Sequence, residues 1–167
     1  MVSVLYFRHM TQKPITLTLI LALICSVNLI AQVDHWEQLV GENNVWKYRL
    51  GNSEPPYDWM SPSFNDASWP SASGGLGYGD GDDQTTVANC ASLYMRRYFT
   101  VNQKQDIEAL IFHGDYDDGF VAYLNGFEIA RGNIDTLLPP YNYSPAQWRE
   151  AKMYQGGEAV TYVVDES

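Results

Sequence analysis

Residues 120–131 (FVAYLNGFEIAR) predict a β-hairpin more strongly than any other stretch predicts its structure. Two runs of strand-forming residues flank the dipeptide Asn125-Gly126. This dipeptide favours a two-residue type I′ turn, because both central residues of that turn need positive φ. The hairpin indicates that the chain folds as an antiparallel β-protein.

Turn signals recur along the rest of the chain at a spacing typical of β-sandwiches and barrels. Further strands are expected at residues 45–50, 93–101, 109–113 and 162–164. A short helix is expected at residues 143–153, where Ser144 would cap the N-terminus and Pro145 would lie in the first turn.

A long stretch rich in Pro and Gly, residues 51–91, separates two of these strands. A loop of this length is usually functional or packed by its own side chains. Trp59, Phe64, Trp69 and Tyr78 occur within it. These aromatic residues predict packing of the loop across one end of a sheet rather than a mobile linker.

The N-terminus predicts an export signal. Residues 15–31 (ITLTLILALICSVNLIA) form an apolar run that follows Lys13 and ends at the small residue Ala31. This pattern is typical of a secretory signal peptide. The alternative, a membrane anchor, is disfavoured because Thr, Ser and Asn interrupt a run already shorter than the roughly 20 apolar residues of a spanning helix. We therefore expect a signal peptide at residues 1–31, one domain at 32–167, no transmembrane segment after cleavage, and a secreted or cell-surface location.

The charge of the chain argues against nucleic-acid binding. Twenty acidic and 10 basic side chains give a formal net charge of −10. A nucleic-acid-binding protein needs a basic face to displace counterions from phosphates.

Two acidic, glycine-rich clusters are candidate ligand or metal sites. One contains Asp115, Asp117 and Asp118, and the other contains Asp80 and Asp82. Calcium takes six to eight oxygen ligands, which such loops can supply, so Asp80, Asp82, Asp115 and Asp117 are candidate Ca²⁺ ligands. Tight turns favour the same residues, because Asp caps its own backbone and Gly accepts positive φ. Direct contact between the first cluster and a ligand is the third alternative.

No catalytic group of residues is evident, and we expect the protein not to be an enzyme. The sequence contains neither G-x-S-x-G nor H-E-x-x-H, and nothing in it brings two glutamates together as a glycosidase requires. Exposed Trp and Tyr can stack on sugar rings, and Trp148 lies in a polar, Pro-rich stretch. Arg131, on the return strand of the hairpin, faces either solvent or an anionic partner.

The order of motifs resembles a galactose-binding-like β-sandwich domain, a jelly roll, of secreted bacterial multidomain proteins. In such proteins this domain accompanies spore-coat-H-type kinase-like domains and lamin-tail domains. The hairpin is also similar to that of the sugar-binding domain of family 2 glycosidases. The resemblance covers roughly residue 36 to the end. The matching segments are WKY (46–48), PYDW (56–59), FNDASW (64–69), GLGYGD (75–80), YMRRYF (94–99), DDGFVAYLNG (117–126) with Glu128, Ala130 and Arg131, EA (150–151) and YQGG (154–157).

This resemblance implies an ancillary binding module. Asp115, Asp117, Asp118, Asn125, Arg131 and Trp148 are the candidate ligand-binding residues. Carbohydrate is the expected ligand, in a carbohydrate-binding or adhesion role. The alternative is a structural spacer or docking domain of a larger secreted enzyme or kinase-like protein. Since the family's sandwich continues beyond the Gly-Gly segment, we also expect this domain to lack its last strands.

Overall fold

The computed structural model describes residues 2–15, 29–79, 81 and 83–164, and these residues form an all-β protein. Within these ranges no α-helix forms, and the two 3₁₀ turns are η1 (Lys104–Asp106) and η2 (Met153–Gln155). The strands lie in several sheets that are mostly antiparallel and are consistent with a β-sandwich. The predicted fold class is therefore confirmed at this level.

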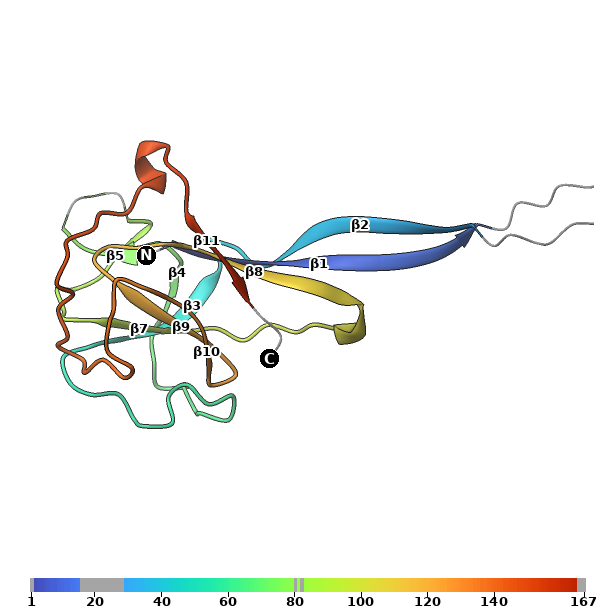
Figure 1. Cartoon of the computed structure of the whole chain (residues 1–167). Helices are drawn as coiled ribbons and strands as arrows, with labels where there is room; N and C mark the ends of the chain where they lie inside the picture. Colours follow the sequence, from blue (N-terminus) through green and yellow to red (C-terminus); the bar gives the residue numbers. More distant parts are fainter. Residues whose placement is uncertain (1, 16–28, 80, 82, 165–167) are drawn as a thin grey trace, which may run out of the picture.

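The largest sheet has four antiparallel strands in the order β11-β8-β1-β2. Its members are β1 (Val2–Ile15), β2 (Leu29–Val40), β8 (Ile107–Asp115) and β11 (Val160–Val164). The far end of the β1–β2 hairpin projects from the body of the molecule (Figure 1). The strands predicted at 109–113 and 162–164 are confirmed, and both extend further toward the N-terminus than predicted.

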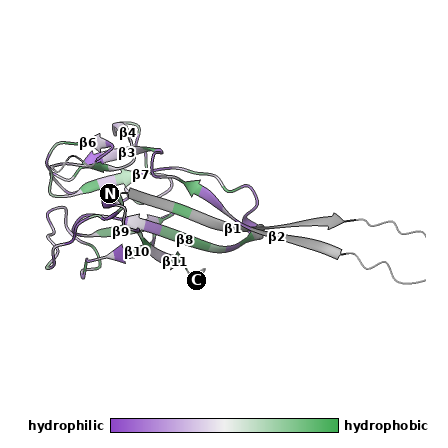
Figure 2. Ribbon diagram, turned by 90° about the horizontal axis from the view of Figure 1, so that it is seen from above, coloured by the Kyte–Doolittle hydropathy of each residue, from purple (hydrophilic) through white to green (hydrophobic). Residues whose placement is uncertain are grey.

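Three smaller sheets complete the body. The order β4-β3-β7 joins β4 (Ser71–Ser73), β3 (Val45–Leu50) and β7 (Leu93–Arg96), and β9 (Phe120–Leu124) pairs with β10 (Phe127–Gly132). A short parallel pair joins β5 (Leu76–Gly77) and β6 (Thr85–Thr86). Figure 2 shows hydrophobic residues along parts of β7 and β8.

Aromatic side chains between β8 and the β9–β10 hairpin form the centre of the core. Phe120 contacts Tyr116 and Phe112, with ring centroids 4.6 and 5.6 Å away. Leu5, Val40 and Ala130 complete the buried cluster. Such aromatic pairs add stability beyond the apolar area that they bury.

The hairpin prediction is confirmed. β9 and β10 pair in antiparallel register on either side of the turn. Asn125 and Gly126 have φ of 54° and 88°. Both values are positive, as the type I′ geometry requires.

The helix predicted at 143–153 is wrong, because other groups take the main-chain N–H groups that it would need. The Asp115 carboxylate accepts the N–H groups of Lys152 and Met153 at 2.8–3.0 Å. The Asp117 carboxylate accepts that of Ala151 at 2.5 Å. Only the turn η2 forms, at the end of this segment.

The strand predicted at 93–101 ends early, as β7, at Arg96. At that point the side chains of Arg96 and Tyr98 turn toward the 59–64 segment and donate hydrogen bonds to its carbonyls.

The 51–91 stretch is packed by its own side chains, as predicted. Trp69 is buried, and its ring lies 5.6 Å from that of Phe64. The short strands β4, β5 and β6 also lie in this stretch and were not predicted. Tyr78 is 45% exposed, and its hydroxyl donates a hydrogen bond to the Cys90 carbonyl of the same stretch at 3.4 Å.

The apolar run of the predicted signal peptide, residues 15–31, falls largely on residues 16–28, which lie outside the described residues. The residues before and after them belong to β1 and β2. In the part of the chain that the structure describes, we find no helix with the length and apolar character needed to cross a bilayer. Cleavage after Ala31 stays a prediction.

Candidate functional site

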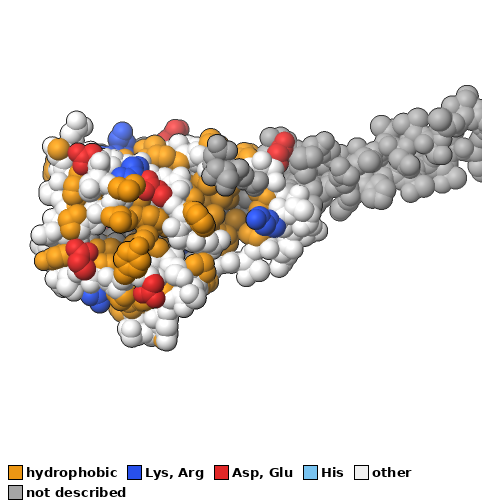
Figure 3. Space-filling view, turned by 60° about the horizontal axis from the view of Figure 1, so that its bottom comes forward, with side chains coloured by type: hydrophobic (Ala, Val, Ile, Leu, Met, Phe, Trp, Pro, Cys, Tyr) orange, Lys and Arg blue, Asp and Glu red, His pale blue; other side chains and the backbone are white. Residues whose placement is uncertain are grey.

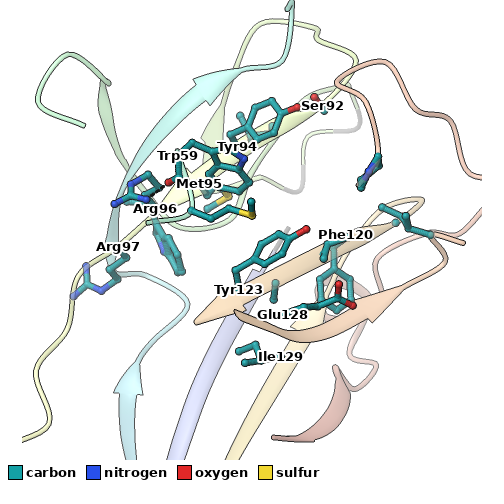
Figure 4. A pocket seen from close by; sticks show the side chains of 18 of the residues that line it. Trp59, Ser92, Tyr94, Met95, Arg96, Arg97, Phe120, Tyr123, Glu128 and Ile129 are labelled. Carbon is teal, nitrogen blue, oxygen red and sulfur yellow. Dashed lines mark hydrogen bonds between the residues drawn. The ribbon is translucent and has the colours of Figure 1, made fainter. Parts of the chain in front are cut away.

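A large cleft opens between β7 on one side and the β9–β10 hairpin on the other, with a volume of about 2290 Å³. Trp59 lies across it and joins the two sides. Its ring makes edge-on contacts with Tyr94 of β7 at 5.1 Å and with Tyr123 of β9 at 5.9 Å. Figure 4 shows Trp59, Tyr94 and Met95 facing Tyr123 and Ile129 across the opening. The inner part of the cleft is therefore aromatic.

The rim of the cleft also carries large exposed side chains. Tyr57 and Trp148 are 91% and 83% exposed, and Phe127 and Leu138 are also exposed. On the face of the molecule seen in Figure 3, hydrophobic side chains gather around a hollow, with single charged groups between them. Contiguous exposed apolar surface of this kind marks interaction sites in soluble proteins.

Arg96 positions Trp59. Its guanidinium donates hydrogen bonds to the carbonyl oxygens of Trp59 and Ser61 and pairs with Asp66 at 3.1 Å. The guanidinium also lies 5.0 Å from the centre of the Phe64 ring. A buried cation thus satisfies carbonyl groups that this irregular segment does not pair internally.

Burial changes the pKa values of the phenol groups in the cleft. It raises the pKa of Tyr94, and it raises the pKa of Tyr123, where the negative charge of Glu128 adds to the effect. Arg131 holds the pKa of Glu128 below its ordinary value through a two-pronged ion pair of 2.5 and 2.6 Å. Around neutral pH both phenols are therefore neutral hydrogen-bonding groups, and Glu128 is ionised.

Four of the six predicted ligand-binding residues line this cleft. They are Asp117, Asp118, Asn125 and Trp148. Asp115 does not line it, being only 1% exposed. Arg131 lies outside the lining as well, and its guanidinium donates hydrogen bonds to the carbonyls of residues 134, 136 and 137.

The Asp115–Asp118 cluster connects β8 to the 149–153 segment. Asp118 has φ of 53°, and its N–H donates to the Arg149 carbonyl at 2.8 Å. The Asp115 carboxylate also faces the Arg149 guanidinium at 3.8 Å. These bonds hold the cluster against a distant segment of the chain, and within the cluster the Gly119 N–H donates to the Asp117 carbonyl at 2.8 Å.

A metal site is not assembled by the described residues. No group of three His, Cys, Asp or Glu side chains among them could hold an ion. Asp80 and Asp82 lie outside the described residues, so calcium binding in that loop stays a prediction.

The sequence did not single out Trp59, Tyr94 and Tyr123 as binding residues. Trp59 was expected only to pack its loop, and Tyr94 and Tyr123 only to lie in strands. Their one signal was alternation: Tyr94 and Tyr123 follow Leu93 and Ala122 on strands where successive side chains point to opposite faces. That pattern does not say which face borders a cleft.

Comparison with known proteins identifies no relative. No family model, curated protein or solved structure matches the chain.

Proposed function

We propose that this domain is a non-catalytic carbohydrate-binding module of a secreted or cell-surface protein. The observation that carries the proposal is the cleft with aromatic rings at two levels, Trp59, Tyr94 and Tyr123 inside and Tyr57 and Trp148 at the rim. Sugar rings present C–H faces that pack on aromatic faces. Ligand sites combine such apolar surface with a few polar groups, here the two phenols and the Asn125 amide.

The resemblance to the galactose-binding-like sandwich supports the same proposal. Asn125, which lies in the matching segment 117–126, lines the cleft. The predicted signal peptide would deliver the domain to a compartment where polysaccharides are accessible.

A glycan array probed with the full chain tests the proposal. For a glycan that binds, Trp148→Ala and Tyr57→Ala are each expected to weaken binding about tenfold, equivalent to about 1.4 kcal/mol. Tyr154→Ala is the matched control, because Tyr154 is exposed but does not line the cleft. If no glycan binds, or if the control weakens binding as much, the proposal is wrong.

Calcium is tested in parallel by thermal unfolding with the ion and with a chelator. A ligand that binds only the folded state raises the unfolding midpoint. A higher midpoint with calcium would assign an ion site, which the described residues by themselves do not form.

A spacer or docking role is the second candidate, favoured by the edge strand β11. Among the described strands, β11 pairs only with β8, and Val163 on it is 77% exposed. An exposed apolar edge strand is a surface on which another chain can pair. Val160→Lys, on the same strand but outside the lining of the cleft, should abolish such pairing and leave glycan binding unchanged.

A further inference from the structure

We propose that the cleft selects an uncharged polysaccharide chain several sugar units long and excludes acidic polysaccharides. This inference rests on the proposed function and adds the class of ligand. It follows from the charged groups that line the cleft and from the size of the cleft.

The three arginines of the lining are already engaged by the protein. Arg96 is held by Asp66 and by main-chain carbonyls. Arg97 donates to the Val45 carbonyl at 2.5 Å. Arg149 donates to the Tyr116 carbonyl, lies over the Tyr116 ring at 3.7 Å, and faces Asp115.

Acidic sugars need such groups to be free. Carboxylates are recognised best by the planar, two-pronged guanidinium of arginine. Here Arg96 would have to break internal hydrogen bonds to reach a uronic acid, and the nitrogens of the other two that have no hydrogen-bond partner, Arg97 Nε and Arg149 Nη2, are buried. Lys104 is the one lysine in the lining. It is a compact, strongly hydrated charge without that geometry.

The acidic side chains of the lining also disfavour binding of acidic polysaccharides. Glu54 accepts the Tyr141 N–H at 3.0 Å, and Glu128 is paired with Arg131. Glu150 is exposed on the rim beside Trp148 and Arg149. Its negative charge, on a chain with a formal net charge of −10, repels an approaching polyanion.

The size of the cleft points to a chain of sugars rather than a single ring. Pockets for small molecules commonly measure about 300–1,000 Å³, and this cleft measures about 2290 Å³. Its aromatic rings lie at two levels, from the inner Trp59 to the exposed Tyr57 and Trp148. A single sugar fills only a small part of such a volume, whereas an oligosaccharide can extend from the inner rings to the exposed ones.

Titration calorimetry on the full chain tests the inference with three kinds of hexasaccharide. Neutral probes are the hexamers of glucose, xylose and mannose, the anionic probe is hexagalacturonate, and the cationic probe is hexameric chitosan. We expect at least one neutral hexamer to bind about tenfold or more tighter than its monosaccharide and than hexagalacturonate. Its affinity should change less than about twofold between low and high salt, since it makes no ion pairs.

The outcomes separate the two proposals. If hexagalacturonate or the chitosan hexamer binds tightest, the domain still binds carbohydrate but the inference about uncharged chains is wrong. If a monosaccharide binds as tightly as its hexamer, the inference about chain length is wrong. If none of the probes binds, the proposed function fails and the inference fails with it.

The variant Glu150→Lys tests how far negative charge at the rim disfavours acidic polysaccharides. Reversing this rim charge should raise the affinity for hexagalacturonate several-fold and leave the neutral hexamer unchanged. Glu158→Lys is the matched control, because Glu158 is exposed but does not line the cleft. Equal effects of the two variants would overturn the role given to the rim charge.

Discussion

Two irregular segments flank the cleft, and buried ions of opposite sign anchor them. Arg96 holds the 59–61 segment by its carbonyl oxygens, whereas Asp115 holds residues 152–153 by their N–H groups. Each ion also has a partner of opposite charge, Asp66 at 3.1 Å for Arg96 and Arg149 at 3.8 Å for Asp115.

The difference between the two anchoring ions shows how a small β-protein stabilises long loops. Main-chain groups that lose water must find partners. A segment that presents carbonyls inward needs a cation with several donors, and a segment that presents N–H groups inward needs a carboxylate. The sign of the buried ion follows from which main-chain groups the segment turns toward it.

Asp115→Ala should have the largest effect on stability. It removes the acceptor of two main-chain N–H groups and leaves Arg149 without its carboxylate. Loss of one partner of a buried pair costs about 3–5 kcal/mol, to be measured by denaturant unfolding. Asp58→Ala, at an exposed carboxylate, should stay within about 0.5 kcal/mol. Equal effects would show that Asp115 does not anchor the segment.

Arg96→Leu should cost somewhat less, about 2–3 kcal/mol, because its partner Asp66 is less deeply buried than Asp115. Arg96→Lys should restore only part of the loss, since an ammonium group cannot span the carbonyls of Trp59 and Ser61 together. Unfolding of both variants checks this, and full recovery by lysine would mean that charge alone anchors the loop.

Alkaline pH should destabilise the protein through Tyr162 of β11, whose ring contacts Phe112 and Phe120 in the core. Burial, followed by the Tyr116 hydroxyl, raises the pKa of Tyr162 from 10.0 to about 12. The folded state therefore favours the neutral phenol, so this contribution is complete below pH 10 and is lost as pH rises toward about 12. The free energy of unfolding, measured across this pH range, should fall less steeply with pH in Tyr162→Phe than in the unchanged protein. An unchanged slope would contradict the prediction.

Gly126→Ala tests a region that neither ion holds and should have the smallest effect, about 1 kcal/mol. A Cβ there would lie 3.8 Å from the Met60 carbonyl, an ordinary contact, so the positive φ alone carries the cost. Asn125→Gly should change stability by only a few tenths of a kcal/mol. Thermal unfolding of both variants checks this prediction. If Gly126→Ala left the stability unchanged, the positive φ at residue 126 would carry no cost.

The elements predicted correctly from sequence are those that local chemistry determines. The β9–β10 turn depends on two adjacent residues, Asn125 and Gly126, and β3 on the alternation within six residues. The 143–153 segment has good local helix signals, yet Asp115 and Asp117, more than 30 positions away, take its N–H groups.

The candidate site was predictable only in part, for the same reason. The exposed Trp148 and the turn residue Asn125 were identified because their local sequence marks them. The position of Trp59 depends on Arg96, which is 37 positions away in sequence. No spacing rule connects residues that meet only when separate sheets pack.

The place of β1 in the sheet gives the predicted signal cleavage a structural meaning. β1 lies between β2 and β8 and is antiparallel to both. Removal of residues 1–31 would take out an interior strand together with Leu5, a member of the buried cluster. The remaining strands would face each other in parallel across two inter-strand spacings, about 9–10 Å, too far for direct hydrogen bonds. Maturation of the chain would then be a rearrangement of the sheet, and the precursor and its product would be two different folded states.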